Sequence, residues 1–150
     1  MTANPASRWQ GPEQSPGFLL WRVTLSWQRA MRAALAPHDL THVQFVLLTT
    51  TWWLGQSGEA PTQQRLAERA GTDTMMTSQV VRKLAERGLL DRAPDPADAR
   101  VRRLQVTGPG LAVVKGALAD VERADAGFFA ALGEDSTGTF VSTLGALVRD

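Results

Sequence analysis

Two short helical patterns meet at a glycine within residues 61–107. The first begins at Pro61, with Thr62 as its expected N-cap, and ends at Gly71. Residues 72–74 supply a cap for the second pattern, and Gly88 ends it. This arrangement predicts two helices that are joined by a tight turn.

An extended segment follows the second of these helices and returns along itself. Residues 89–92 lead into Pro94-Asp95-Pro96, which we do not expect to remain in a regular strand ladder. Residues 100–107 then alternate, with Val101, Leu104 and Val106 as the apolar members. Helix, tight turn, helix and hairpin together predict a winged helix-turn-helix. The expected fold class is mainly α, with a small β-hairpin as the wing.

The second helix of this region separates its residues onto two sides. At about 100° per residue, one side gathers Met76, Thr77, Val80, Val81 and Leu84. The opposite side carries Met75, Ser78, Gln79 and Arg82, flanked by Lys83. Glutamine can pair with adenine, and arginine can bridge the two acceptors of guanine, so this side suits a major groove. An ordinary solvated face is the alternative interpretation.

Helical patterns also occupy residues 17–55 and 108–150. A helix is expected over 18–35, another over 109–131 with a break at 133–135, and a final helix over 140–148. Residues 40–55 suit a strand by their β-branched members, but Thr41 as a cap and Gly55 as an end favour a helix. The apolar faces are too broad for a small winged helix to bury, which predicts a helical dimerisation region. An intramolecular bundle is the alternative.

Composition and charge narrow the functional classes. The chain has 150 residues, 43% of them hydrophobic, and no cysteine, which excludes disulfides and thiolate chemistry within it. No apolar run is long enough to span a membrane and no signal pattern begins the chain, so a cytoplasmic protein is expected. The net charge is +1, but residues 61–107 hold nine Lys/Arg against six Asp/Glu. Basic groups therefore gather where phosphate contacts are expected. Residues 1–16 are expected to be a mobile arm.

The wing and its exit resemble those of the MarR family of transcription regulators. The motif consists of two aspartates, an arginine, an alternating strand and a glycine, here Asp95, Asp98, Arg100, Leu104, Val106, Thr107 and Gly110. The stretches QRLAERAG and VVRKLAERGLLDR also resemble the two DNA-binding helices of that family. The resemblance covers roughly residues 17–148 and implies one MarR-like domain over 1–150. It further implies a homodimer on a pseudo-palindromic operator, acting as a repressor.

The expected DNA contacts lie on the second helix, on the wing and at the start of the first helix. Base reading is assigned to Ser78, Gln79 and Arg82, with Thr74 and Met75 near the same edge. Contacts with the DNA backbone are expected from Thr62, Gln63, Thr77, Arg102 and Arg103, and Lys83, which flanks the base-reading side, is also an expected DNA contact. Capping and solvation explain Thr62 and Gln63 equally well. Arg102 and Arg103 should point to opposite sides of the strand, so only one is expected to face phosphate.

By resemblance, Arg100 is the wing arginine that reaches toward the minor groove. Asp98 would hold the turn or orient Arg100 through a charge-assisted bond. The alternative is that this pair stabilises the turn without contacting DNA.

The resemblance also implies a site for an aromatic or anionic effector between the two parts of the protein. Aromatic and basic side chains occur in the two helices expected to line it, namely Trp21, Arg22, Trp27, His38, His42, Phe45, Trp52 and Trp53. Plain core packing is the alternative for each tryptophan. A bound ligand would change the spacing of the recognition helices and release DNA.

Other functional classes receive little support from the sequence. No metal site is expected, because the only histidines are His38 and His42 and there is no cysteine. No cofactor or enzyme activity is expected either, since no nucleophile–base set, phosphate loop or dinucleotide fingerprint occurs. The main rival is a winged helix that contacts only other proteins.

Overall fold

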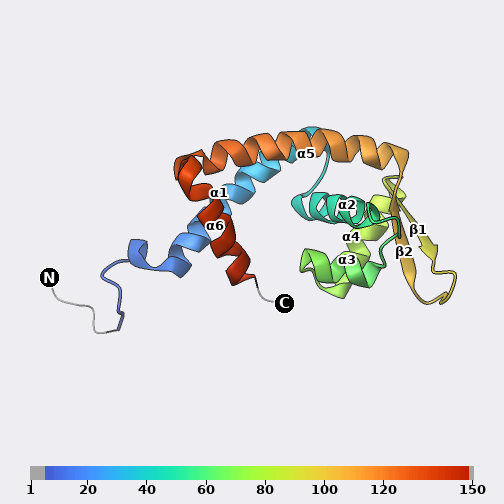
Figure 1. The fold of residues 1–150 in the computed structure, drawn as a ribbon, viewed down its shortest axis with the longest axis horizontal. Coiled ribbons are helices and arrows are strands. Elements are labelled where there is room, and N and C mark those ends of the chain that lie inside the picture. Colours follow the sequence, from blue (N-terminus) through green and yellow to red (C-terminus); the bar gives the residue numbers. More distant parts are fainter. Residues whose placement is uncertain (1–5, 149–150) are drawn as a thin grey trace.

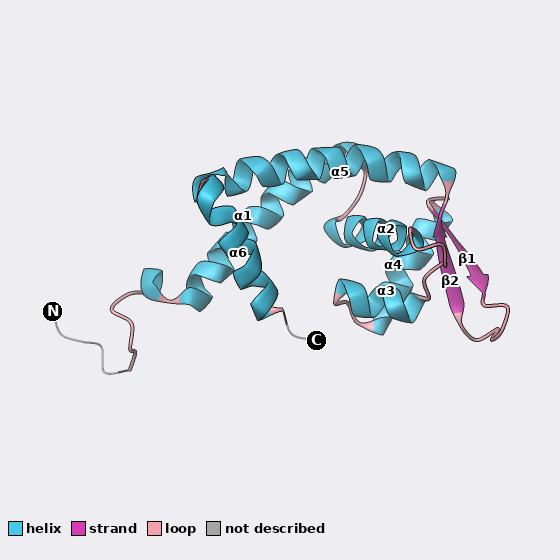
Figure 2. Ribbon diagram, viewed as in Figure 1, coloured by secondary structure: helices cyan, strands magenta, loops and turns pink. Residues whose placement is uncertain are grey.

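The computed structural model describes residues 6–148, which form a compact lobe and a projecting arm linked by one long helix (Figures 1 and 2). The α-helices of this part of the chain are α1 (Pro16–Leu35), α2 (His42–Gly55), α3 (Gln63–Ala70), α4 (Thr74–Glu86), α5 (Gly108–Phe129) and α6 (Glu134–Leu147). The strands are β1 (Leu90–Pro94) and β2 (Arg102–Val106). Short 3-10 helices are η1 (Pro12–Gln14), η2 (Ala36–His38) and η3 (Ala130–Leu132). The predicted mainly α fold with a hairpin wing is confirmed.

Side-chain caps begin the helices where the sequence indicated. The Thr41 hydroxyl accepts from the Gln44 amide, while the Gln44 side chain accepts from the Thr41 amide, which forms a reciprocal capping box. Thr62 begins α3 and Asp73 begins α4 in the same way, each with one accepted backbone bond. The segment 40–55, which suited either a strand or a helix, is therefore helical from His42.

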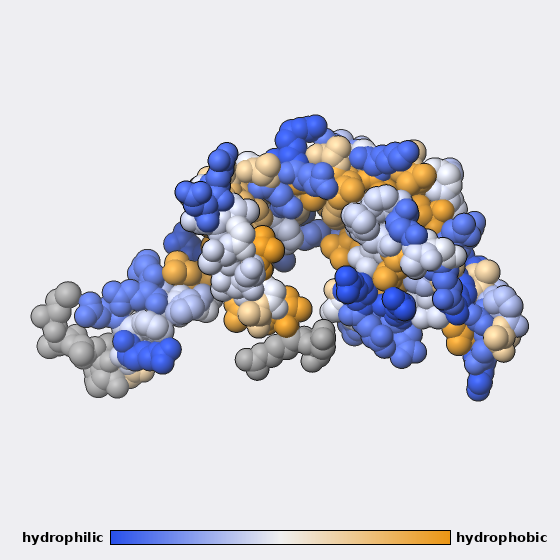
Figure 3. Space-filling model, in the orientation of Figure 1, coloured by the Kyte–Doolittle hydropathy of each residue, from blue (hydrophilic) through white to orange (hydrophobic). Residues whose placement is uncertain are grey.

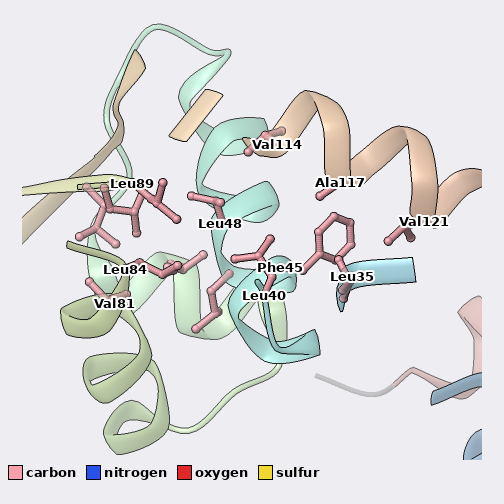
Figure 4. Close-up of a cluster of buried hydrophobic side chains, with 14 of the residues drawn as sticks. Leu35, Leu40, Phe45, Leu48, Val81, Leu84, Leu89, Val114, Ala117 and Val121 are labelled. Atoms are coloured by element: carbon pink, nitrogen blue, oxygen red, sulfur yellow. The ribbon is translucent and has the colours of Figure 1, made fainter. Parts of the chain in front are cut away.

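We call residues 42–106 the winged lobe. Its core continues onto α1 and α5, and Figure 4 shows Leu48, Leu84 and Val114 among the clustered side chains. The fully buried large residues of this cluster are Met31, Leu35, Leu47, Leu48, Leu66, Val81, Leu84, Leu90, Leu104 and Val114. Helices α2, α3, α4 and α5 and both strands each contribute, so burial of these residues fixes the relative positions of α3, α4 and the hairpin.

The hairpin is antiparallel, with Leu90 opposite Val106 and Pro94 opposite Arg102. The prediction that Pro94 leaves the ladder is wrong by one residue, because proline is tolerated at the last pair of a strand that has no further neighbour. The predicted strand 100–107 is shorter, running from Arg102 to Val106. At the exit, a Cβ on Gly110 would overlap the Leu89 carbonyl oxygen, so α5 can begin this close to the hairpin only with glycine there.

We call residues 16–30 and 122–147 the helical arm. Helix α6 contains no buried residue, and the buried residues of α1 are confined to its last turns, at Met31 and Leu35. Large apolar side chains are exposed instead, and they are Phe18, Leu19, Leu20, Trp21, Val23, Leu25, Val141, Leu144 and Leu147, with Val148 just beyond α6. Hydrophobic surface on α6 is visible in Figure 3.

Three sequence expectations about the ends of the chain need correction or restriction. The break predicted at 133–135 is confined to Gly133. The last helix, predicted over 140–148, already begins at Glu134, and the acidic residues of its first turn are favourable there. The expected mobile arm, residues 1–16, is described only from Ala6, and α1 already begins at Pro16. Residues 1–5 and 149–150 lie outside the described residues. No helix within 6–148 is long and apolar enough to cross a membrane.

Candidate nucleic-acid interface

Helix α4 presents a polar face away from the core. Gln79 and Arg82 are exposed and Ser78 is half-buried, while Met75 keeps 72% of its surface accessible. We call Met75, Ser78, Gln79 and Arg82 the reading face. The opposite side of the helix packs into the core, where Val81 and Leu84 are fully buried, and this packing fixes the position of the reading face. Lys83 and Thr74 are also exposed, on either side of this face.

Thr77 has a structural role. Its hydroxyl is fully buried, donates to the Asp73 carbonyl at 2.8 Å and lies 2.7 Å from the Thr72 hydroxyl. The predicted phosphate contact by this side chain therefore does not fit its position. The sequence pattern groups Met76 with Val81 and Leu84, which are buried, but Met76 itself is 42% exposed near the start of the helix.

A cleft of about 720 Å³ separates the wing from the starts of α3 and α4. Its walls include Thr62 and Gln63 at the start of α3, Asp73 and Thr74 at the start of α4, and residues 100–102 of the wing. The Thr62 hydroxyl accepts from the Arg65 amide at 3.1 Å, so this side chain already serves as a cap. The cleft brings the predicted backbone-contacting residues of both helices beside the wing.

In the wing, Asp98 holds Arg100 by three bonds. Its Oδ1 accepts from the Arg100 amide and Nε, each at 3.0 Å, and its Oδ2 accepts from Nη2 at 3.1 Å. These bonds from Arg100 hold the pKa of Asp98 below its usual value. Arg100 remains exposed while Asp98 orients its guanidinium. This arrangement agrees with both predicted roles of the Asp98–Arg100 pair, which are to stabilise the turn or to contact DNA.

The two neighbouring wing arginines differ. Arg103 is half-buried and its Nε donates to Asp95 at 2.5 Å, while its Nη1 donates to the Ala60 carbonyl at 2.7 Å and pairs with Glu59 at 3.0 Å. Arg103 therefore fastens the wing to the loop before α3, and the bond from Arg103 lowers the pKa of Asp95. Arg102 is exposed and faces the cleft, which leaves it as the member of the pair able to approach phosphate.

Sequence reasoning missed the partners of Arg103. Asp95 was recognised only as part of the wing motif, and it also caps the turn by accepting from the Ala97 and Asp98 amides at 2.7 and 3.2 Å. The preference of aspartate for such turns was a usable local signal. Glu59 gave no signal, because the chain does not reveal that its loop lies against β2.

The residues expected to bind an effector do not form one cluster. Trp27 and His42 meet edge to face with ring centroids 5.0 Å apart, and Trp27 Nε1 donates to Asp125 Oδ1 at 2.8 Å. Burial lowers the pKa of His42, and the charge of Asp125 opposes this effect. Phe45 is buried in the core nearby along α2. A cavity of about 430 Å³ adjoins this corner, lined by Gln28, Arg32, Ala36, Leu40, Thr41 and His42.

The other expected effector residues lie elsewhere. Trp52 and Trp53 pack against each other at 4.8 Å near the end of α2, about 16 Å along the helix from His42 at about 1.5 Å per residue. Trp21 and Arg22 are exposed on the helical arm. His38 contacts α5 instead, with its Nε2 2.7 Å from Asp120 Oδ2. The eight residues thus cannot line one small pocket of a single chain.

No group of three or more histidine or acidic side chains within residues 6–148 is arranged to hold a metal ion.

Comparisons with known proteins agree with this architecture. A family model described as the MarR family matches residues 40–101. The HTH-type transcriptional regulator YdcH of Bacillus subtilis is 49% identical over 125 residues, which are 83% of this chain and 85% of that protein. The HTH-type transcriptional repressor Rv2887 of Mycobacterium tuberculosis is 34% identical over 116 residues, 77% of this chain and 81% of that protein.

A solved structure extends the similarity to the whole fold. CouR from Rhodococcus jostii RHA1, bound to p-coumaroyl-CoA, superposes with a TM-score of 0.82 at 27% sequence identity. The match covers 93% of this chain and 95% of CouR. The sequence identity to YdcH over most of both chains and the structural similarity to CouR together show the family. The chain belongs to the MarR family and is a DNA-binding transcriptional regulator.

Proposed function

We propose that a homodimer of this chain reads a pseudo-palindromic operator and represses transcription until an aromatic or anionic effector binds. The observation that carries the proposal is the reading face of α4, exposed beside the cleft and the oriented Arg100. Two such faces related by a two-fold axis would enter successive major grooves about 34 Å apart.

Each side chain has an assigned role in this proposal. Ser78, Gln79 and Arg82 contact base edges, and the exposed Met75 offers an apolar contact to them. Gln63, Lys83 and Arg102 contact the DNA backbone, and the start of α3 at Thr62 adds free backbone amides. Thr74 joins them instead of the base-reading edge, because it lines the cleft with Gln63 and Arg102. Thr77 and Arg103 support these contacts from within the protein, because their polar groups are already bonded.

The second subunit is proposed from the helical arm. Its exposed apolar side chains include Trp21, at 62% exposure, and Leu147, at 64%. Exposed apolar surface of this kind is unfavourable in water and would be stabilised by burial against an identical copy. The proposal therefore assigns α1 and α6 to the dimer interface.

The effector site is proposed at the corner of α1 and α2. The cavity there offers the cation of Arg32 and the imidazole of His42, with Trp27 behind His42. An aromatic carboxylate matches this chemistry. The relative CouR is described as bound to p-coumaroyl-CoA, and Rv2887 is described as a repressor, which supports both parts of the proposal.

Fluorescence anisotropy can test DNA reading with duplexes selected by the protein from randomised DNA. Arg82→Ala is expected to weaken binding to the selected duplex by about 1–3 kcal/mol and to affect scrambled DNA less. Lys115→Ala, which removes one charge from the exposed surface of α5, is the control and should change neither. Equal loss on both duplexes for Arg82→Ala would show a phosphate contact only. No binding at low salt by the parent protein would reject the proposal.

A panel of phenolic acids can test the effector site. We expect an active compound to change tryptophan fluorescence and release the selected duplex, and Trp27→Phe should reduce the fluorescence change. Trp53→Phe is the matched control, because Trp53 lies about 16 Å along α2 from His42 at about 1.5 Å per residue, and it should leave the fluorescence change intact. Fluorescence and DNA affinity that stay constant across the panel would contradict the effector proposal and leave DNA reading intact.

A further inference from the structure

The turn between α1 and α2 is bonded to α5 on one side and to α4 on the other. His38 Nε2 lies 2.7 Å from Asp120 Oδ2 of α5. The next residue, Asp39, accepts at its carbonyl oxygen from Arg87 Nη1 at 2.7 Å. Arg87 is the C-cap of α4, the helix that carries the reading face. Two adjacent residues of one turn thus connect the long helix α5 to the recognition helix.

The backbone of this turn has little freedom to absorb a movement. Asp39 is in the left-handed region, with φ 52° and ψ 44°, which is uncommon for a residue other than glycine. Leu40, which follows it, is buried in the core, and the capping box of Thr41 and Gln44 then begins α2. Arg87 Nη1 also lies 3.5 Å from Gln44 Oε1. A displacement of α5 should therefore also displace α4, and the reverse.

The His38 ring packs closely against helix α5. A Cβ on Gly116 would lie 3.1 Å from His38 Cε1 and 3.5 Å from Nδ1, so the imidazole rests against the helix backbone at this glycine. Asp120 is one turn further along and accepts from Arg123 at 2.7 Å through its other oxygen. The bonds from His38 and Arg123 keep the pKa of Asp120 below its usual value, so the carboxylate stays charged.

We propose that His38, Asp39 and Arg87 are positioning residues that set the tilt of α4 relative to α5. They do not contact DNA, and they act by fixing the direction in which the reading face points. The proposal deepens the proposed function, because two α4 helices can match the half-sites of an operator only if each is held at a set angle. A purely local stabilising role is the alternative, and it predicts a change in stability without a change in helix position.

Three substitutions separate these roles. Arg87→Met removes the bond to Asp39 and keeps much of the side-chain length. Gly116→Ala pushes against the His38 ring without removing a polar group, and alanine favours a helix more than glycine does. Arg123→Met is the matched control, because it removes a bond to Asp120 that lies within α5 alone.

The tilt of α4 can be measured within one chain. The protein lacks cysteine, so spin labels can be attached at Lys83→Cys on α4 and Ala119→Cys on α5, both exposed positions. Diluting the labelled chain in excess unlabelled chain confines the dipolar signal to distances within one chain. We expect Arg87→Met and Gly116→Ala to shift or broaden the distance distribution, and Arg123→Met to leave it unchanged. Identical distributions in all variants would overturn the proposal.

DNA affinity and thermal unfolding provide the second readout. Arg87→Met and Gly116→Ala should lose about 2- to 30-fold in affinity for the selected duplex, and Gly116→Ala should do so without a lower melting temperature. Unchanged affinity for both variants, or an affinity loss that only follows a lower melting temperature, would contradict a positioning role. If the parent protein failed to dimerise or to bind DNA, the proposed function would fail, while the distances within one chain would still decide the coupling.

Discussion

The winged lobe and the helical arm differ in how far they bury their apolar side chains. The lobe contributes buried residues from every helix and strand, and within residues 6–148 no buried polar side-chain atom lacks a hydrogen-bond partner. The arm carries exposed apolar side chains on α1 and α6, and α6 buries none. The same long helix, α5, serves both, with its buried residues between Gly110 and Val121 and none beyond.

The two parts of the protein therefore obtain their stability from different sources. The lobe has enough apolar burial to hold the reading face without help from outside the chain. The arm can reach comparable burial only against another surface, which we propose is a second copy. Substitutions in the two regions should therefore respond differently to protein concentration.

A core substitution in the lobe should have the largest effect. Leu84→Ala removes a fully buried side chain behind the reading face and should lower the free energy of unfolding by about 2–5 kcal/mol. Chemical denaturation at several protein concentrations measures this loss, which should not depend on concentration. Leu147→Ala, on the exposed end of α6, is the control and should matter only where the dimer forms. If Leu84→Ala and Leu147→Ala lowered the free energy of unfolding equally in dilute monomer, the proposed difference between lobe and arm would be contradicted.

Charges placed on the arm should act next most strongly, and on assembly alone. The double variant Val141→Glu, Leu144→Glu adds two carboxylates to the exposed apolar face of α6. We expect it to weaken self-association by at least about 2 kcal/mol, or about 30-fold, because the charges would be desolvated in the interface. Analytical ultracentrifugation measures the change. A dimer of unchanged affinity would move the interface away from α6.

A buried hydroxyl in the lobe should have a smaller effect. Thr77→Val removes the bonds from Oγ1 to the Asp73 carbonyl and the Thr72 hydroxyl and should lower stability by about 1 kcal/mol. Thermal unfolding and DNA titration together measure it, and reading of the selected duplex should be preserved. Thr74→Val, at an exposed position, is the matched control for stability. A loss of DNA affinity at constant stability would restore the predicted phosphate contact of Thr77.

The smallest predicted effect lies at the junction of the two regions. Burial lowers the pKa of His42 in the folded state, so the folded protein binds a proton there less readily than the unfolded chain. This contribution to stability is therefore present above the ordinary histidine pKa and is lost as pH falls toward the lowered value. His42→Asn should flatten the stability profile in that window, measured by thermal unfolding between about pH 7 and pH 5. An equally steep profile in the variant would assign the change to other groups.

Much of the lobe could be predicted from sequence because its signals are local. Thr41, Thr62 and Asp73 each mark a helix start with a hydrogen bond to a residue three positions away. The alternation predicted over residues 100–107 likewise indicated β2. These patterns depend on neighbours in the chain, which the sequence displays directly.

The contacts that position the candidate site depend on residues far apart in the chain. Arg103 bonds to the Ala60 carbonyl 43 positions away, and Arg87 bonds to the Asp39 carbonyl 48 positions away. A backbone carbonyl carries no sequence signal, so neither contact was predictable. The aromatic residues failed as one predicted cluster for a related reason: the pattern did not show that Trp27 packs against His42 while Trp21 lies exposed on the arm.

Hydroxyl-radical footprinting on a selected duplex can detect both DNA reading by α4 and the presence of a second copy of the chain. We expect two protected regions about 10 base pairs apart, centre to centre, on one face of the DNA, and we expect Arg82→Ala to lose them. A single protected region would contradict the paired recognition helices. Uniform protection that does not depend on Arg82 would contradict sequence reading by α4.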